Sequence, residues 1–361
     1  MNIFYNKGLW MSDSNSIFEL VSKNQVYIIA EAGVNHNGKL EKALELIDVA
    51  HAAGADAVKF QLFNVKEQVS KGANNAPYQR KGSGKKSMID MAKSYDFPWE
   101  KHKILVAHCN EVGIKYMSSC FSKNAVDFFI NDLAGDCIKV GSGELTNHPL
   151  LRYMSKTGKP IILSTGMSTL EDVRGAVIAI RANGISPLIL LHCVSNYPAT
   201  EKEINLNAIN TLASEFNVPV GYSDHSEGNN ASIAAVALGA KVIEKHFTTD
   251  KSLPGPDHAM SLEPKELEEF VKAIRMTEEM LGNGIKKPTE AEKEMQIYAR
   301  RSVVAACDIK AGEQIDKFHI TLKRPATGID PRFIDKITGM RAIVDIPSDE
   351  PVTWDMLKFS F

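Results

Sequence analysis

The sequence predicts an eight-stranded β/α barrel followed by a smaller, β-rich domain. Seven times along the chain a helical stretch ends at a Gly or Asn, and a short apolar run follows. Gly or Asn just past a helix is typical of a left-handed C-terminal cap. Apolar runs without alternation are typical of parallel strands buried on both faces. With the opening strand this makes eight β/α repeats, and such a barrel carries its active site at the carboxyl ends of its strands.

The expected strands are short and regularly spaced. The first covers residues 26–31, and the helix after it has an apolar stripe of Leu40, Leu44 and Ile47. The residues that end the seven helical stretches are Gly54, Gly113, Gly135, Gly158, Gly184, Asn217 and Gly239. The strands that follow them are expected at residues 57–61, 115–119, 137–144, 160–164, 187–192, 219–225 and 241–246.

Domain boundaries follow changes in composition. An N-terminal extension is expected at 1–16, the barrel at 17–282, a charged linker with a helical turn or two at 283–300, and the β-rich domain at 301–361. One connection, residues 63–99, is long. Its Lys-, Gly- and Asn-rich part predicts a functional lid or a disordered loop.

Composition favours a soluble, cytoplasmic protein. A net charge of −2 over 361 residues gives no electrostatic reason to expect nucleic acid or an anionic membrane as a partner. The five cysteines are odd in number and form no CxxC pair, which is typical of a reducing compartment. No apolar run has the length of a membrane span, and the first residues lack the apolar core of a signal peptide.

Two histidines follow the last two expected strands. His225 and His246 are one β/α unit apart, so we expect them on neighbouring strands at the barrel mouth. Glu31 ends the first strand, which adjoins the eighth once the barrel closes. Two imidazoles beside a carboxylate suit a divalent first-row metal. A pair of hydrogen-bonded structural histidines is the alternative.

Lysines and hydroxyls form a second constellation. Lys59 and Lys139 lie on the second and fourth strands, where a buried lysine needs a charged partner. The hydroxyls are those of Ser119, Ser142, Ser164 and Ser223. Together with the glycine-flanked amides of GSGE they suit a phosphate plus a carboxylate, and phosphoenolpyruvate is the obvious candidate. Strand-end lysines that reach solvent are the alternative.

Neutral hydrogen-bonding groups near the strand ends suit a polyol. They are Gln61, Asn35, Ser195, Tyr197 and, after a stiff Pro-Gly-Pro segment, Asp257. Singly, each such residue is more often part of a loop or a cap than a ligand.

Eight motifs carry a family resemblance. AEAGVNHNG, DAVKFQ, KVGSGE, ILSTGM, LLHCVSNYP, GYSDHS, EKHFT and PGPDH occur in this order at the strand ends. Together they resemble those of the bacterial N-acetylneuraminate (sialic acid) synthases and, more broadly, the nonulosonate synthases. KRPATGI resembles the signature of that family's C-terminal antifreeze-like (SAF) domain. The resemblance implies a TIM barrel followed by a SAF domain.

The resemblance also implies a reaction. Phosphoenolpyruvate condenses with N-acetylmannosamine and water to give N-acetylneuraminate and phosphate, with C–O cleavage. A divalent metal is implied on His225 and His246, Mn²⁺ first, with Mg²⁺ or Co²⁺ as alternatives. A domain-swapped homodimer is implied as well, in which Arg324 of the SAF domain reaches the site of the other subunit.

Residue roles follow from the same resemblance. The carboxylate of phosphoenolpyruvate is assigned to Lys59, Ser119 and Lys139, and its phosphate to Ser142, Ser164 and Ser223. The sugar is assigned to Gln61, Tyr197, Asp257 and Arg324, with Ser195 in a loop that faces it. Glu31 corresponds to the acidic residue beside the metal, and Glu144 to the acidic residue of GSGE. We expect both glutamates and both lysines to be catalytic.

Three rival readings stay open. A legionaminate or pseudaminate synthase would use the same chemistry on a 6-deoxy di-N-acetylhexose, and only a few loop residues around Ser195 and Tyr197 would distinguish it from a sialate synthase. A non-catalytic carbohydrate-binding protein is the second rival. The third is an aldolase that forms a Schiff base on Lys59 or Lys139 and needs no metal.

Overall fold

A computed structural model describes Ile17, Val21 and residues 25–70, 72–73, 87–184 and 187–359. The N-terminal extension and most of the expected lid, residues 74–86, lie outside the described residues. The chain divides into two compact units, Met1–Gly282 and Asn283–Phe361. Among the residues described, no helix combines the length and the apolar character needed to cross a membrane.

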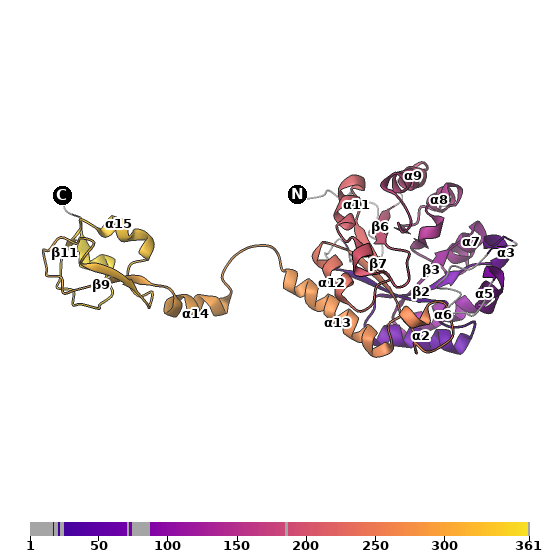
Figure 1. Ribbon diagram of the computed structural model, residues 1–361, viewed down its shortest axis with the longest axis horizontal. Helices are drawn as coiled ribbons and strands as arrows, with labels where there is room; N and C mark the ends of the chain where they lie inside the picture. Colours follow the sequence, from indigo (N-terminus) through magenta and orange to yellow (C-terminus); the bar gives the residue numbers. More distant parts are fainter. Residues whose placement is uncertain are drawn as a thin grey trace. The chain divides into compact units, whose positions relative to one another are not determined.

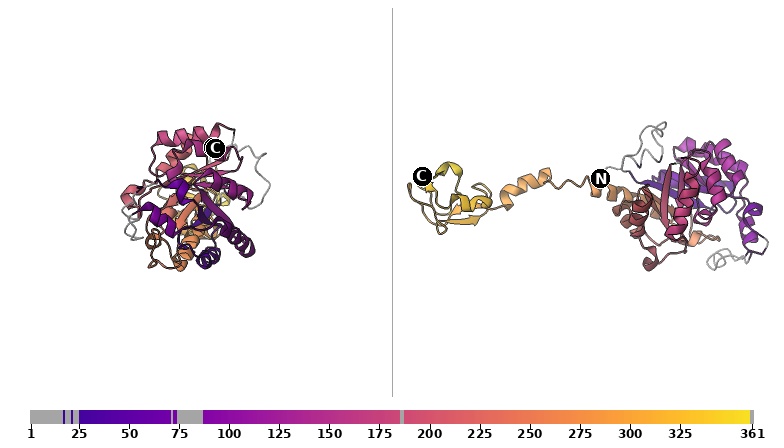
Figure 2. Two further views of the ribbon diagram at one scale, coloured as in Figure 1. Left: turned by 90° about the vertical axis from the view of Figure 1, so that its right-hand side faces the viewer. Right: turned by 90° about the horizontal axis from the view of Figure 1, so that it is seen from above.

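The first unit is a closed barrel of parallel strands whose order around the barrel follows their order in the sequence. Figures 1 and 2 show helices wrapped around these strands. The strands are β1 (Tyr27–Gly33), β2 (Ala57–Leu62), β3 (Lys115–Cys120), β4 (Ile138–Val140), β5 (Ile161–Ser164), β6 (Leu188–Cys193), β7 (Val220–Asp224) and β8 (Val242–His246). The predicted β/α barrel is therefore confirmed. Strand bounds are close to those expected except for the fourth strand, which ends at Val140 because Ser142–Glu144 form a 3-10 helical turn instead.

Helices follow the strands in turn. The outer ring contains α2 (Leu40–Ala52), α6 (Trp99–Val112), α7 (Lys123–Asn131), α8 (His148–Ser155), α9 (Leu170–Arg181), α11 (Ala208–Phe216), α12 (Asn230–Ala237) and α13 (Pro264–Leu281). Shorter helices, α3 (Val65–Gln68), α5 (Met88–Ser94) and α10 (Glu201–Ile204), lie in the connections.

Most of the predicted helix-ending residues have the left-handed backbone expected of them. Six of the seven have positive φ, and Gly135 is the exception. At that turn Ala134 takes the left-handed conformation instead, with φ of 52°. A side chain at Gly135 would clash with the ring of Phe129, so this glycine is needed for space rather than for its dihedral freedom.

The barrel interior changes character along its axis. An apolar cluster fills the half near the strand starts and includes Tyr27, Ile29, Ala57, Ile162 and Val242. Polar side chains replace it toward the strand ends, where Glu31, Lys59, Lys139 and Glu244 are all buried. The apolar half excludes water, so the charged groups at the carboxyl end can be reached by solvent and ligands only from the barrel mouth.

The segment expected to be a charged linker with a helical turn or two contains a ten-residue helix. Helix α14 (Glu290–Ala299) has a capping box at Thr289, and the amide of Ala326 donates to the carbonyl of Ile297 at 2.8 Å. Two antiparallel pairs follow, β9 (Ser302–Ala305) with β10 (Ile320–Lys323) and β11 (Arg341–Ala342) with β12 (Leu357–Lys358). They enclose a separate small apolar core.

Candidate active site

A cavity of about 760 Å³ opens at the carboxyl ends of the barrel strands. All predicted site residues of the first unit except Asn35 line it: Glu31, Lys59, Gln61, Ser119, Lys139, Ser142, Glu144, Ser164, Ser195, Tyr197, Ser223, His225, His246 and Asp257. Arg324 is an exposed residue of the second unit. Asn35 does not line the cavity, and its amide is used elsewhere in the fold.

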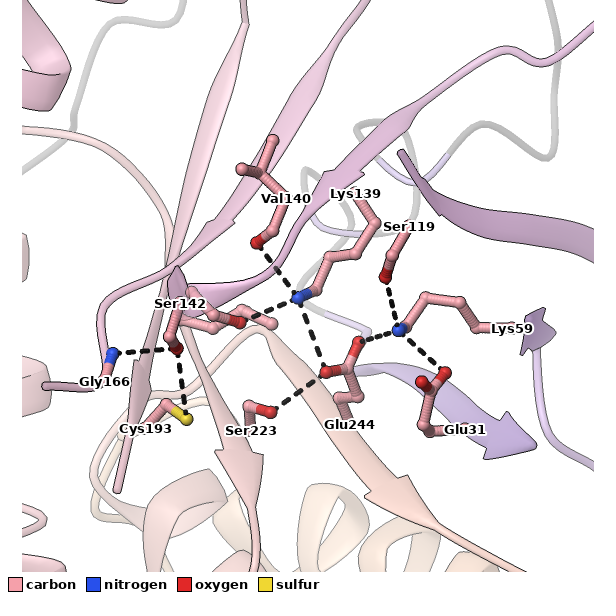
Figure 3. Close-up of polar contacts among 12 residues, drawn as sticks. Glu31, Lys59, Ser119, Lys139, Val140, Ser142, Gly166, Cys193, Ser223 and Glu244 are labelled. Atoms are coloured by element: carbon pink, nitrogen blue, oxygen red, sulfur yellow. Dashed lines mark hydrogen bonds and ion pairs between the residues drawn. The ribbon is translucent and has the colours of Figure 1, made fainter. Parts of the chain in front are cut away.

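Lys59 is held from three sides (Figure 3). Its Nζ lies 2.7 Å from Glu31 Oε2 and 3.6 Å from Glu244 Oε2. It also donates to the Ser119 hydroxyl at 3.0 Å. A buried ammonium thus has two carboxylates and a hydroxyl as partners, which is what its desolvation requires.

Lys139 shares Glu244 with Lys59. Its Nζ lies 3.5 Å from Glu244 Oε1 and donates to Ser164 Oγ at 2.7 Å. Ser223 donates to the same carboxylate oxygen at 2.9 Å. The sequence reasoning missed Glu244, although it precedes His246 by two residues. Alternation along a strand puts residues i and i+2 on one face, so this spacing was a usable signal.

The two carboxylates differ in acidity because their surroundings differ. Burial raises the pKa of Glu31 to about 7, since Lys59 only partly offsets it and the charge of Glu244 adds to it. Burial also acts to raise the pKa of Glu244, but Lys139 and Lys59 outweigh it and lower that pKa. Glu31 is therefore the carboxylate suited to take up and release a proton near neutral pH.

The two lysines also differ in the direction of their pKa shifts. Burial lowers the pKa of Lys139 against the attraction of Glu244. For Lys59, burial acts in the same sense, but Glu244 and Glu31 together outweigh it and raise the pKa. Both lysines point into one polar basin with their hydroxyl partners, an arrangement that suits a small ligand with two anionic groups.

A second hydroxyl group lies beside this basin. The amide of Gly166 donates to Ser142 Oγ at 3.0 Å, and Ser142 Oγ contacts Cys193 Sγ at 3.6 Å. A side chain at Gly166 would clash with Ser195 Oγ, so the TGM glycine lets these groups approach one another. Ser142 and the amide next to it can face a phosphate oxygen as well as each other.

His225 and His246 lie together, with ring centroids 5.6 Å apart. His225 Nδ1 is 2.7 Å from the carbonyl oxygen of Val194, an acceptor that holds a proton on Nδ1, so Nε2 is the atom that can offer a lone pair when the ring is neutral. Burial acts to lower the pKa of His225, but Cys193 and the hydrogen bonds to Cys193 and Val194 outweigh it and raise that pKa. Burial, then His225, lower the pKa of His246 well below its usual range, and its buried Nδ1 has no hydrogen-bond partner. In its neutral form each imidazole has a nitrogen lone pair to offer, and a pair of such nitrogens fits a divalent metal that displaces the proton.

The histidines would supply most of the protein's ligands to such a metal. Among the described residues, no three His, Cys, Asp or Glu side chains cluster closely enough to hold an ion by themselves. Two imidazoles leave coordination positions for water and substrate, which is typical of a catalytic rather than a structural centre.

The residues predicted to contact the sugar surround the histidines. The Tyr197 ring lies 4.1 Å from that of His225, and Gln61 donates to Glu31 Oε1 at 3.2 Å. Burial raises the pKa of Asp257 to about 6, against the pull of His225. Glu144 lines the cavity but accepts a 2.7 Å hydrogen bond from Asn147, apart from the lysine cluster.

The mouth has one apolar side that the sequence reasoning missed. Val34, Phe63, Met91 and Tyr95 pack into one cluster, and all four line the cavity. They come from the ends of β1 and β2 and from α5. Methyl groups of a ligand that reached this side would find apolar contacts there.

Behind the histidines, on the helix-facing side of the strands, lies a second ion pair. Lys245 Nζ is 2.9 Å from Asp224 Oδ2 and donates to the carbonyl of Ser226 at 2.7 Å. Asp224 accepts further hydrogen bonds from Ser226 and from Ser232. Asp224 and Lys245 immediately precede His225 and His246, so this pair fixes the backbone that carries the two imidazoles.

Comparison with protein families identifies the chain. Residues 46–286 match the NeuB family, and residues 300–358 match the SAF domain. The chain belongs to the NeuB family. The predicted resemblance to nonulosonate synthases and the predicted SAF domain are thereby confirmed.

Individual NeuB-family relatives match over nearly their whole length. The N,N'-diacetyllegionaminic acid synthase of Legionella pneumophila is 43% identical, over 95% of this chain and 98% of its own. The N-acetylneuraminate-9-phosphate synthase of Mus musculus is 34% identical, over 91% of this chain and 92% of its own. The crystal structure of the spore coat polysaccharide biosynthesis protein SpsE of Bacillus subtilis superposes with a TM-score of 0.63 at 37% identity, covering 93% of this chain and 96% of that one.

Proposed function

We propose that this chain condenses phosphoenolpyruvate with the open-chain form of an N-acetylated aminohexose, releasing phosphate and a nine-carbon 2-keto acid. One observation carries the proposal: two buried lysines with hydroxyl partners share a cavity with two imidazoles and with a carboxyl whose pKa is raised to about 7. Relatives named as synthases of legionaminic acid and N-acetylneuraminate phosphate support it.

In this proposal phosphoenolpyruvate binds in the polar basin formed by residues of β2 to β7. Lys59, Ser119 and Lys139 bind its carboxylate, and Ser142, Ser164 and Ser223 bind its phosphate. Lys139 Nζ and Ser164 Oγ lie 2.7 Å apart, so the groups assigned to the carboxylate and to the phosphate adjoin each other, as the two anionic groups of one small molecule require. Glu244 forms ion pairs with both ammonium groups, which hold them in place and favour the protonated form of Lys59.

His225 and His246 would hold a divalent metal, Mn²⁺ in the first instance, which acts as a Lewis acid on the sugar aldehyde. Carbon 3 of phosphoenolpyruvate forms the new bond to the aldehyde carbon with the electron pair of its double bond, which leaves carbon 2 electron-poor. The aldehyde oxygen becomes a hydroxyl with the proton that the attacking water gives up. Water then adds to carbon 2, and the bond from carbon 2 to the bridging oxygen breaks, so phosphate leaves with that oxygen. Glu31 is the group we assign to take the proton from this water.

For the acceptor we favour a 2,4-diacetamido-6-deoxyhexose, as in legionaminate synthesis. The more similar of the two relatives above makes the legionaminate product, and the apolar cluster around Met91 suits the methyl groups of a deoxy, doubly acetylated sugar. N-acetylmannosamine, which the motif resemblance implies, is the second candidate, and the neuraminate-type relative favours it.

The test is phosphate release from phosphoenolpyruvate with Mn²⁺, run in parallel on both sugars. We expect turnover with the deoxy sugar at a higher kcat/KM. A preference for N-acetylmannosamine would make the protein a sialate synthase with unchanged chemistry. No phosphate release with either sugar would contradict the proposal and favour a binding protein, and borohydride trapping of a lysine would favour an aldolase.

Isotope labelling tests the bond that breaks. Phosphoenolpyruvate carrying ¹⁸O at the bridging position should release all of its label with phosphate. Label retained in the keto acid would exclude C–O cleavage. His225→Ala should remove Mn²⁺ binding, measured without substrate, together with turnover.

The role of Arg324 depends on assembly. We propose that the SAF domain of one copy covers the barrel of another in a homodimer, as the family resemblance implies. Sedimentation should then give a dimer, and mixing an Arg324→Ala variant with an inactive Lys139→Met variant should restore part of the activity. A monomer with full activity would exclude this arrangement.

A further inference from the structure

The NHNG segment after β1 contacts the loop after β8. Asn35 Nδ2 donates to the carbonyl of Phe247 at 2.8 Å and to Ser261 Oγ at 3.0 Å. Asn37 Nδ2 donates to the carbonyl of Pro254 at 3.2 Å. Two asparagines therefore attach the base and the middle of the 248–262 loop to the end of β1.

His258 connects this segment to the loop from within. Asn37 Oδ1 can only accept, so His258 Nε2, 3.2 Å away, donates to it. His258 Nδ1 then carries the lone pair and accepts from the Thr248 hydroxyl at 2.6 Å. Burial lowers the pKa of His258 to about 4, so this neutral tautomer persists at neutral pH. The hydrogen bonds from His258 to Asn37 and from Asn37 to Pro254 thus have a defined direction, and the Thr248 hydroxyl, which is also 3.2 Å from the carbonyl oxygen of Asp250, has His258 Nδ1 as its nearer acceptor.

The loop is also closed on itself. The amide of Thr248 donates to the carbonyl of Leu262 at 2.8 Å, and Ser261 Oγ donates to the carbonyl of Asp257 at 2.6 Å. Gly255 packs so closely on the His258 ring that a side chain there would clash. The Asp257 backbone is consequently held on both sides of the residue.

These contacts leave the Asp257 side chain facing the cavity. The space above Gly33 is bounded by Glu31 Oε1, Gln61 Nε2 and Asp257 Oδ2, which a Cβ on Gly33 would meet at 3.4, 3.5 and 3.6 Å. Asn35, Asn37, Thr248 and His258 do not themselves line the cavity. They act on the loop and not on a bound molecule.

We propose that Asn35, Asn37, Thr248 and His258 form a latch that positions Asp257 for the acceptor sugar. The latch residues are positioning residues rather than catalytic ones. This inference rests on the proposed function, which assigns Asp257 to the acceptor.

The decisive variant is Thr248→Val, which keeps the side-chain volume and removes the hydroxyl from His258. We expect the KM for the acceptor sugar to rise by about tenfold or more, because a small misplacement of a substrate-positioning group is costly. The KM for phosphoenolpyruvate should stay unchanged. Thr248→Ser, which restores the hydroxyl, should restore the acceptor KM.

Tyr116→Phe is the matched control. It removes a hydroxyl that lies 2.6 Å from the Nδ1 of another buried histidine, His102, away from the cavity. It should lower Tm and leave both KM values unchanged. If Thr248→Val behaves like this control, or raises both KM values equally, the latch is overturned.

Two further variants separate the possible failures. Asn37→Ala, at a half-buried position, should reproduce the rise in acceptor KM if Thr248→Val does not fold. Asp257→Asn should raise the acceptor KM at least as much. No effect of Asp257→Asn would refute the role of Asp257 in the proposed function, whereas an effect there and none in the latch variants would refute the latch alone.

Discussion

Two buried lysine–carboxylate clusters, an outer pair on β7 and β8 and an inner group from β1, β2, β4 and β8, use their hydrogen-bonding atoms differently. In the outer cluster, Asp224 accepts from Ser226, Ser232 and Lys245, and Lys245 also donates to a backbone carbonyl. In the inner cluster, the Oε2 atoms of Glu31 and Glu244 face Lys59 and have no hydrogen bond of regular geometry.

The difference separates structural charge from functional charge. The outer pair is fully satisfied by protein atoms, so it serves to hold two strands in register. The inner group consists of two lysines and two carboxylates beside a cavity. An anionic ligand can therefore replace a carboxylate as the partner of a lysine. Buried charge by itself does not indicate a site, whereas buried charge with incomplete partners next to a cavity does.

Removing an inner lysine should give the largest effect on function. Lys139→Met is expected to lower kcat/KM by about 10²–10³-fold, because a preorganised cation in a water-poor site is lost. Glu244 keeps Lys59 and Ser223 as partners, so Tm should fall only slightly. Phosphate release and thermal unfolding check the two parts. A large loss of Tm with retained activity would assign Lys139 to the structural class.

Breaking the outer pair should reverse this pattern. Asp224→Asn leaves Lys245 buried without its counter-charge, at an expected cost of about 3–5 kcal/mol in the free energy of unfolding. Urea unfolding measures it, and kcat of the folded fraction should change far less than in Lys139→Met. The double variant Asp224→Asn/Lys245→Met should recover most of the stability. Equal losses in the single and double variants would contradict this account.

The inner cluster should also control the pH dependence. Below about pH 7 Glu31 is protonated and cannot accept a proton, so kcat/KM should rise with pH through that value. On the alkaline side kcat/KM should fall as Lys139 loses its charge, earlier than an ordinary lysine would, because its pKa is lowered. Lys139→Arg should move this fall to higher pH. A profile that is flat through neutrality would exclude Glu31 as the base.

Two serines give the smallest and most closely matched comparison. Ser232→Ala removes one donor to Asp224 and should cost about 1 kcal/mol of stability without changing either KM. Ser223→Ala removes one donor to Glu244 and should raise the KM for phosphoenolpyruvate. Steady-state kinetics on both variants checks the contrast, and it fails if the two serines behave alike.

Much of the site was predictable because strands impose a local rule. Each strand could be recognised from its apolar run, and its last residues had to lie at the barrel mouth. Lys59, Lys139 and His246 were placed in this way, and all line the cavity. Alternation also pointed to Glu244, but a glutamate between an apolar run and a lysine carries no sign of its partners.

Asn35 illustrates where such reasoning stops. It follows a strand end next to predicted ligands, yet its amide binds the backbone of Phe247, more than two hundred residues away in the sequence. Whether a polar side chain at a strand end faces the cavity or a neighbouring loop depends on the path of that loop, which no local pattern describes.

The sequence by itself determined the barrel, the order of its strands, the polar residues at its mouth and the family to which they belong, because periodicity and chain reversal are local properties. Tertiary structure alone decided that Glu244 lies between Lys59 and Lys139, that the outer pair is fully satisfied, and that His258 links Thr248 to Asn37. The first contact crosses the barrel, the second joins neighbouring strands and the third joins two loops, and in each case only the folded chain brings residues distant in the sequence within hydrogen-bonding distance.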